Sequence, residues 1–146
     1  MKLSEKDLRK LRNIVIEWFL VNGRDFPWRK TSDPYLILVA EILLHRTSAN
    51  KVTPVYMSLV SRYPNLRSLA AADEEDLRVT IKPLGFLFRT SKLRQIAAIL
   101  IEKFDGRVPD SLTDLKLLPG IGDYTARAIL CFAYGLPFAV VDRNIV

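Results

Sequence analysis

The sequence predicts an all-α protein, folded as one helical domain over residues 1–146. Apolar residues recur near the 3.6-residue helical period in most segments, capping residues precede these segments, and Gly or Pro follows them. The sequence has no strand-rich region, no internal repeat and no low-complexity linker. With 146 residues, of which 49% are hydrophobic, the chain is large enough to bury one core.

A first helix is expected within residues 1–22. Ser4 is a good N-cap, Gly23 ends the helix, and apolar residues follow the helical period at Leu8, Leu11, Val15, Trp18 and Phe19. We expect the apolar face of this helix to lack a partner within the chain and to form an exposed patch. A loop containing Pro27 then leads to a helical bundle over residues 33–146.

The bundle is predicted to form around one central helix. Asp33 is its cap and Pro34 occupies its first turn, and apolar residues surround it on nearly every side to about Arg46. Pro83 and Gly85 are expected to break a short helix that starts with an acidic turn. The remaining helices are predicted at about residues 49–63, 73–82, 88–104, 112–117 and 123–134.

Composition narrows the class of partner. The net charge of +6, from 22 basic and 16 acidic residues, favours polyanions, although charge alone is a weak indication. No uncharged apolar run approaches the ~20 residues that span a bilayer, and the N-terminus lacks the apolar core of a signal peptide. We therefore expect no membrane partner and a cytoplasmic, nucleoid-associated location. The single cysteine, Cys131, excludes an internal disulfide and a cysteine metal cluster, and is expected to be buried.

A glycine turn at residues 118–123 predicts a phosphate site. Gly120 and Gly122 allow positive φ and a close approach of the backbone to a ligand. A helix follows at once, and the free N–H groups of its first turn favour an anion. A bare Gly-x-Gly is more often a plain turn between helices. The full run from Leu118 to Ile129 resembles the helix-hairpin-helix motif of DNA-binding proteins. This resemblance implies a monovalent cation at the carbonyls of Lys116, Leu118 and Ile121, and contacts to the DNA backbone by Leu118, Gly120, Ile121, Gly122, Tyr124 and Thr125.

Asp142 is the candidate catalytic carboxylate. It follows the apolar residues 138–141, which are expected to be buried, and it precedes what reads as another helix. An N-cap aspartate is the ordinary interpretation of this pattern. A fixed carboxylate can also stabilise the positive charge that develops on a sugar when an N-glycosidic bond breaks, and can orient the attacking water.

Together these motifs carry a family resemblance over nearly the whole chain. The run Leu-Pro-Gly-Ile-Gly-x-Tyr-Thr-Ala-x-Ala-Ile, followed by Val-Asp-x-Asn, resembles the helix-hairpin-helix (HhH-GPD) DNA glycosylase superfamily. Residues 23–29, 33–35 and 40–44 resemble the branch of thymine–guanine mismatch and adenine glycosylases. The resemblance implies a helical bundle with a helix-hairpin-helix motif, double-stranded DNA as partner, and Asp142 as the catalytic aspartate.

The same resemblance gives Tyr124 and Glu41 roles. Bifunctional members carry a lysine at the position of Tyr124, and tyrosine cannot form the Schiff base that leads to strand cleavage. Serine is common there in adenine glycosylases, whereas tyrosine is similar to the thymine mismatch enzymes. Glu41 is the single charge among residues 34–44, so its pKa is expected to be raised and its carboxyl group to hydrogen-bond the extruded base. The plainer alternatives are a packing tyrosine and a glutamate on a wet face.

Two further segments are expected to act on the duplex. Bulky apolar residues at a turn, Phe86 and Leu87, suit insertion into the base stack, with core packing of this turn and Phe88 as the alternative. Residues His45, Arg46 and Thr47 end the central helix and are expected to read the opposite strand. Arg46 is the candidate for a guanine there.

The sequence therefore predicts a monofunctional DNA glycosylase of base excision repair, acting on thymine or uracil opposite guanine. The alternatives are an adenine glycosylase acting opposite 8-oxoguanine or guanine, and a non-catalytic DNA-binding fragment. Relatives in this branch continue with further helices and often a 4Fe–4S cluster. We therefore expect no cofactor within residues 1–146, a cluster only in a continuation beyond Val146, and completion of the fold by a missing C-terminal segment or a second polypeptide.

Overall fold

The computed structural model describes residues 3–85 and 88–141, and all regular structure in these residues is helical. The elements are α1 (Glu5–Asn22), η1 (Pro27–Arg29), α2 (Pro34–Leu44), α3 (Ala49–Arg62), α4 (Leu66–Ala70), α5 (Glu74–Ile81), η2 (Lys82–Leu84), α6 (Phe88–Lys103), α7 (Leu112–Leu115) and α8 (Asp123–Tyr134). The all-α prediction is confirmed. None of the described helices is long and apolar enough to cross a membrane.

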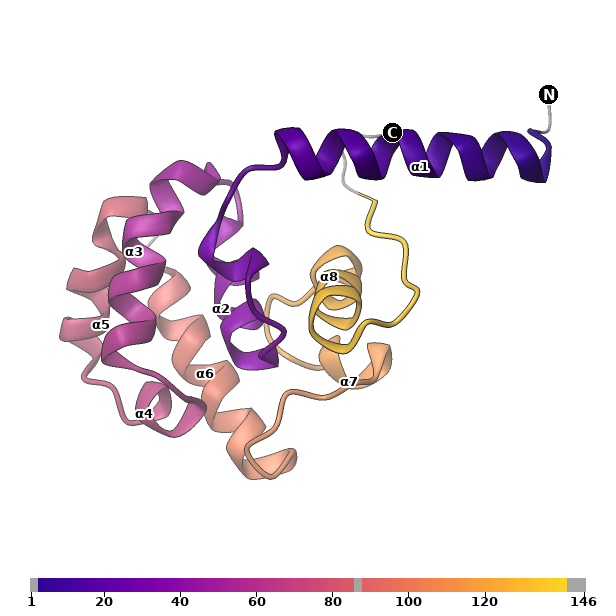
Figure 1. Cartoon of the computed structure of the whole chain (residues 1–146). Coiled ribbons are helices and arrows are strands. Elements are labelled where there is room, and N and C mark those ends of the chain that lie inside the picture. The colour runs from indigo at the N-terminus through magenta and orange to yellow at the C-terminus, as the bar shows by residue number, and fades with distance from the viewer. Residues whose placement is uncertain (1–2, 86–87, 142–146) are drawn as a thin grey trace.

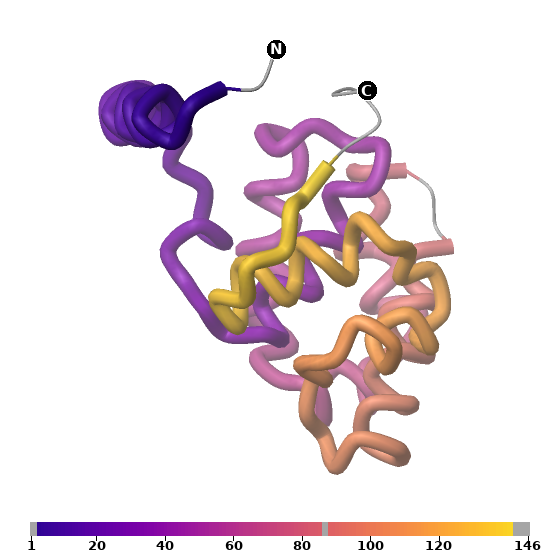
Figure 2. Tube along the Cα trace, turned by 90° about the vertical axis from the view of Figure 1, so that its right-hand side faces the viewer, coloured from indigo at the N-terminus to yellow at the C-terminus, as the bar shows by residue number. Residues whose placement is uncertain are grey.

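Helix α1 projects from the bundle, above α8 (Figures 1 and 2). Its start is fixed by a capping box, in which the Ser4 hydroxyl accepts the N–H of Asp7 at 3.2 Å and the Asp7 carboxylate accepts the N–H of Ser4 at 3.3 Å. Gly23 ends it, as expected. None of its residues is buried, and Trp18 is 62% exposed. The expected exposed apolar face is therefore present.

Helix α2 is the centre of the bundle and packs against α3, α6 and α8 (Figure 1). Its start is fixed by the Asp33 carboxylate, which accepts the N–H of Tyr35 at 2.8 Å. The Tyr35 hydroxyl donates to the carbonyl of Tyr63 at 2.5 Å and so ties α2 to the end of α3. The prediction of a buried central helix is confirmed, since eight of its residues are buried.

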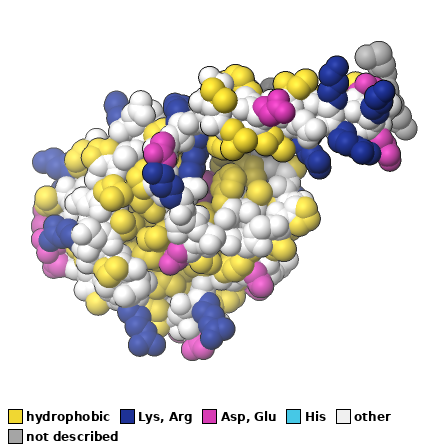
Figure 3. Space-filling model, viewed as in Figure 1, with side chains coloured by type: hydrophobic (Ala, Val, Ile, Leu, Met, Phe, Trp, Pro, Cys, Tyr) yellow, Lys and Arg dark blue, Asp and Glu magenta, His cyan; other side chains and the backbone are white. Residues whose placement is uncertain are grey.

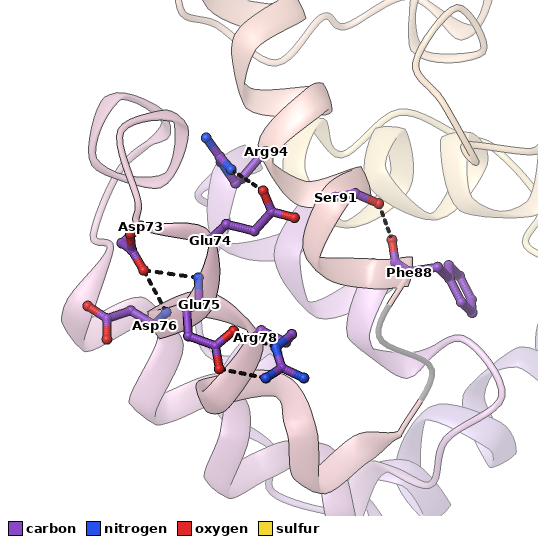
Figure 4. A network of polar contacts seen from close by, with 8 residues as sticks. All are labelled: Asp73, Glu74, Glu75, Asp76, Arg78, Phe88, Ser91 and Arg94. Carbon is purple, nitrogen blue, oxygen red and sulfur yellow. Dashed lines mark hydrogen bonds and ion pairs between the residues drawn. The ribbon is translucent and has the colours of Figure 1, made fainter.

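Helices α5 and α6 lie on either side of the turn that was predicted to enter DNA. The Asp73 carboxylate caps α5 by accepting the N–H groups of Glu75 and Asp76, both at 3.0 Å (Figure 4). Arg94 of α6 reaches back to Glu74 of α5 at 2.9 Å (Figure 4). Surface pairs of this kind contribute about 0–1 kcal/mol each, so packing of the two helices holds this region more than charge does.

Helix α8 begins at Asp123 and ends at Tyr134, and its C-cap, Gly135, has a φ of +63°, the left-handed conformation. Two expectations about this part of the chain are wrong. Cys131 is half-buried, because it lies 200° around α8 from the buried Ile129. Residues 138–141 have no regular structure and run over the surface, so that Val141 is 53% exposed.

Candidate active site

A cavity of about 810 Å³ lies between α1, the loop after it, α2 and α8. Figure 3 shows apolar side chains along α1 and a hollow between this helix and the bundle. Three distant stretches of the sequence therefore form one concave surface. The lining residues used below are Phe19, Arg24, Trp28, Arg29, Glu41 and Tyr124.

Glu41 is the buried acid of this cavity. Its place on the central helix leaves the side chain 7% exposed, and desolvation raises the pKa of its carboxyl group to about 7. Among the described residues, no side chain forms an ion pair with it. The expected rise in pKa is confirmed, and the alternative of a glutamate on a wet face is wrong. The group can both donate and accept a hydrogen bond near neutral pH.

Tyr124 lines the same cavity from the first turn of α8, and 40% of it is exposed. A helix-start residue of the hairpin is thus brought to the same space as a mid-helix residue of α2, 83 positions earlier in the sequence. Tyr124 is therefore accessible from the cavity, and its role there stays a prediction. A phenol at this point offers a hydroxyl and an aromatic ring to a ligand but no amine.

One wall of the cavity is an aromatic and guanidinium stack that was not singled out from the sequence. The rings of Phe26 and Trp28 are stacked with centroids 5.1 Å apart, and Trp28 also meets Tyr56 edge-on at 5.3 Å. Arg29 lies over Phe26 at 5.4 Å and over Phe19 of α1 at 5.5 Å. The alternation of Arg and aromatic residues at positions 24–29 was the available signal. The stack fixes the position of Trp28 in the lining of the cavity.

The hairpin at residues 118–123 presents a helix start to solvent. Leu118 and Ile121 are buried and anchor it, and the Leu118 carbonyl accepts the N–H of Ile121 at 3.1 Å. Gly120 has a φ of +78°, as expected, but Gly122 has an extended φ of −88°, so the expectation of positive φ at both glycines is wrong for Gly122. Gly122 is the N-cap and no side chain caps α8, which leaves the helix start accessible to an anion.

The predicted reading loop contacts the hairpin helix. His45 Nε2 lies 3.0 Å from the hydroxyl oxygen of Thr125. Thr125 as a whole is 2% exposed, whereas Gly122 and Tyr124 beside it are exposed. Thr47 is half-buried, whereas Arg46 is exposed and has a φ of +54°. Arg89 of α6, which was not predicted as a site residue, donates from Nη2 to the His45 carbonyl and, at 2.7 Å, to the Thr47 hydroxyl.

Several predicted residues lie outside the described part of the chain: Asp142, Phe86 and Leu87. Phe88, which follows Leu87 in the sequence, is 48% exposed, and Lys92 Nζ lies 4.8 Å from the centre of its ring. The core-packing alternative is therefore wrong for Phe88. Lys116 precedes the hairpin in the sequence, and its Nζ lies 3.5 Å from Oδ1 of Asp123. Within residues 3–85 and 88–141, no three His, Cys, Asp or Glu side chains are placed to hold a metal ion.

The comparison with known proteins gives the same family as the motifs. Over 146 residues the chain is 42% identical to a thymine-DNA glycosylase of Aeropyrum pernix. The alignment covers 99% of this chain and 66% of that protein. The chain is 35% identical to an adenine DNA glycosylase of Mycolicibacterium smegmatis, over 90% of this chain and 45% of the relative. The solved structure of a thermostable thymine-DNA glycosylase superposes with a TM-score of 0.83 at 35% identity, covering 94% of this chain and 65% of that one.

The chain thus spans about two thirds of the length of these thymine-DNA glycosylases and less than half of the length of the adenine enzyme. A family model described as the HhH-GPD superfamily base excision DNA repair protein matches residues 39–146, which is well over half of the chain and contains the hairpin. The chain belongs to the HhH-GPD superfamily of base excision DNA repair proteins.

Proposed function

We propose that the chain carries the active site of a monofunctional DNA glycosylase that hydrolyses the N-glycosidic bond of thymine or uracil opposite guanine. The observation that carries this proposal is the shared cavity of Glu41 and Tyr124, placed beside a hairpin whose helix start is open to a phosphate. Its volume of about 810 Å³ is within the usual range for small-molecule pockets and is ample for an extruded base. The similarity to thymine-DNA glycosylases supports the choice of base.

Glu41 is proposed to bind the base rather than the sugar. A group with a pKa of about 7 is present as both acid and carboxylate near neutral pH. Its carboxylate can accept the ring N–H of thymine or uracil, and its acid form can donate to a carbonyl oxygen. Trp28, whose ring lines the same cavity, offers a face on which the base can stack.

Tyr124 supports base removal without strand cleavage. A lyase step needs an amine that attacks the sugar and forms a Schiff base, and tyrosine has none. We therefore expect hydrolysis by water, with Asp142 as the catalytic carboxylate that stabilises the oxocarbenium-like sugar and orients the water. The products are a free base and an abasic site.

The other predicted site residues are proposed to bind the DNA duplex. The hairpin binds a backbone phosphate, with a monovalent cation at the carbonyls of its turn as a further proposal. Phe86 and Leu87 fill the space that the extruded base leaves, and Arg46 reads the guanine opposite. The single cysteine cannot supply the four thiolates of a 4Fe–4S cluster, so we place any such cluster outside residues 1–146. We propose that a further segment or a second polypeptide covers the exposed face of α1.

Single-turnover base release tests this proposal. Duplexes that contain T opposite G, U opposite G, or A opposite 8-oxoguanine are incubated with the chain, and each is analysed with and without alkali. We expect strand breaks at T·G or U·G that require alkali, and none without it. The Asp142→Asn variant should bind as the wild type does and release no base. Turnover by this variant equal to wild type would refute the catalytic assignment.

Two other results would redirect the proposal. Release of adenine alone would favour the adenine glycosylase, which the 35% identity to such an enzyme supports. The acid form of Glu41 in the cavity can also protonate a departing purine. Duplex binding that weakens with salt, with no abasic product on any substrate, would favour a non-catalytic DNA-binding module.

A further inference from the structure

The buried side chain of Arg89 hydrogen-bonds the loop at the end of α2. It lies in the first turn of α6 and is 1% exposed. One of its terminal nitrogens, Nη2, donates to the carbonyl of His45 and to the hydroxyl of Thr47. These two acceptors are the residues on either side of Arg46, so a single guanidinium nitrogen bridges the loop across Arg46.

The residue between the two acceptors is in an unfavourable conformation. Arg46 has a φ of +54°, which residues other than glycine, asparagine and aspartate rarely adopt. The other non-glycine residue with positive φ among the described residues, Asp105, lies where α6 ends, beside Gly106. Arg46 has no glycine beside it, and its side chain is exposed. A strained residue of this kind persists when its surroundings over-determine it, and such residues cluster at functional sites.

A second contact fixes the loop to the DNA-facing hairpin. The His45 ring reaches Thr125 Oγ1 at 3.0 Å, and Thr125 lies three residues after Gly122 at the start of α8. The loop is thereby joined to α6, which follows the predicted wedge turn, and to α8, which follows the hairpin. Both contacts therefore fix the position of the loop relative to α6 and α8.

We propose that Arg89 is a positioning residue for opposite-strand reading: it holds Arg46 in the left-handed conformation that directs its side chain at the guanine opposite the extruded base. Without this bridge, Arg46 relaxes to negative φ and its guanidinium leaves the direction in which two parallel hydrogen bonds to guanine are made. This inference rests on the proposed function, because it presupposes that Arg46 reads that guanine.

A double-mutant cycle tests the inference without requiring turnover. The probes are duplexes with a stable tetrahydrofuran abasic analogue opposite G or opposite A, and the measured quantity is the ratio of the two dissociation constants. We expect the wild type to favour G by roughly 5- to 100-fold, the discrimination typical of a bidentate Arg–guanine contact. Arg46→Ala should bring the ratio near 1, and Arg89→Met should do the same, with Arg89→Lys in between because it keeps a donor.

The decisive result is the combination. In the Arg89→Met background, Arg46→Ala should change the ratio no further, whereas a purely structural Arg89 predicts that Arg46→Ala keeps its full effect. If Arg89→Met does not fold, Thr47→Val removes one acceptor of the bridge at a half-buried site and replaces it in the cycle. An additive cycle in folded variants overturns the inference and leaves the proposed function intact. A wild-type ratio near 1 overturns guanine reading and this inference together, while base release from T·G tests the glycosylase itself.

Strain at Arg46 gives an independent readout. While the bridge is intact, Arg46→Gly should melt at a higher temperature than Arg46→Ala, since glycine accepts positive φ. In the Arg89→Met background this order should reverse. A relaxed loop has no positive φ that favours glycine, and glycine loses more conformational entropy on folding than alanine does. The same order in both backgrounds would refute the role of Arg89 in holding the conformation.

Discussion

Lys92 of α6 lies against the turn at Gly120, so close that its Nζ would stand 2.6 Å from a Cβ added to that glycine. The two residues belong to elements 28 positions apart, and their contact places a cation beside the open helix start of α8. The two glycines of the hairpin thus have different surroundings: Gly120 has the Lys92 side chain beside it and a positive φ, whereas a Cβ added to Gly122 would meet open space.

Replacing Gly120 with alanine should lower the free energy of unfolding by about 1–2 kcal/mol, measured by urea denaturation. The φ of +78° carries most of this cost, because the flexible end of Lys92 can move aside. Gly122→Ala is the matched control: its φ is −88° and an added Cβ has open space around it, so we expect only the smaller cost of replacing a glycine N-cap with alanine, about 0.5 kcal/mol. Equal losses at both positions would contradict this account.

Gly122→Val should weaken binding to every duplex alike, measured by fluorescence anisotropy on matched and mismatched DNA. The space that an added side chain would occupy is empty in the protein, so its effect falls on the approach of a phosphate to the start of α8. Phosphate contacts carry no base information. A loss confined to one mismatch would show instead that the hairpin reads bases.

Glu41→Gln should stabilise the protein at high pH and leave it unchanged near pH 4. Burial raises the pKa of Glu41 to about 7 from an ordinary value of 4.5. Between these values the folded state keeps a proton that the unfolded state has lost, so stability falls as the pH rises through this range. Above pH 7 the penalty amounts to about 3 kcal/mol, which glutamine does not incur. Urea unfolding of both proteins at pH 4 and pH 8 measures it, and a difference independent of pH would exclude a buried acid.

Thr125→Val should cost about 1 kcal/mol of stability, because it removes the hydroxyl that contacts His45 while keeping the shape of a buried side chain. Thr125→Ser, which keeps the hydroxyl, should retain the contact at the cost of a methyl group. The two variants are compared by thermal melting at pH 7.5. The histidine resonances should shift in the valine variant and not in the serine variant, and identical spectra would show that the contact is absent in solution.

The helices follow largely from local rules that the sequence displays. Pro34 in a first turn, the acidic turn after Asp73 and the glycine at 135 mark helix ends that the structure reproduces. Helix α4 was missed, because five residues are too few for a periodic pattern. Its signal was local: the Asn65 side chain accepts the N–H of Ser68 at 2.9 Å.

The sequence by itself determined the all-α class, the central place of α2, the hairpin and the family, since these depend on periodicity, caps and a contiguous motif. Tertiary structure alone decided that Glu41 and Tyr124 share a cavity, that the Arg29 stack forms its wall, and that Arg89 bridges the loop at Arg46. Each of these joins residues tens of positions apart or selects one face of a helix. Such contacts are set by how helices pack, which no local pattern encodes.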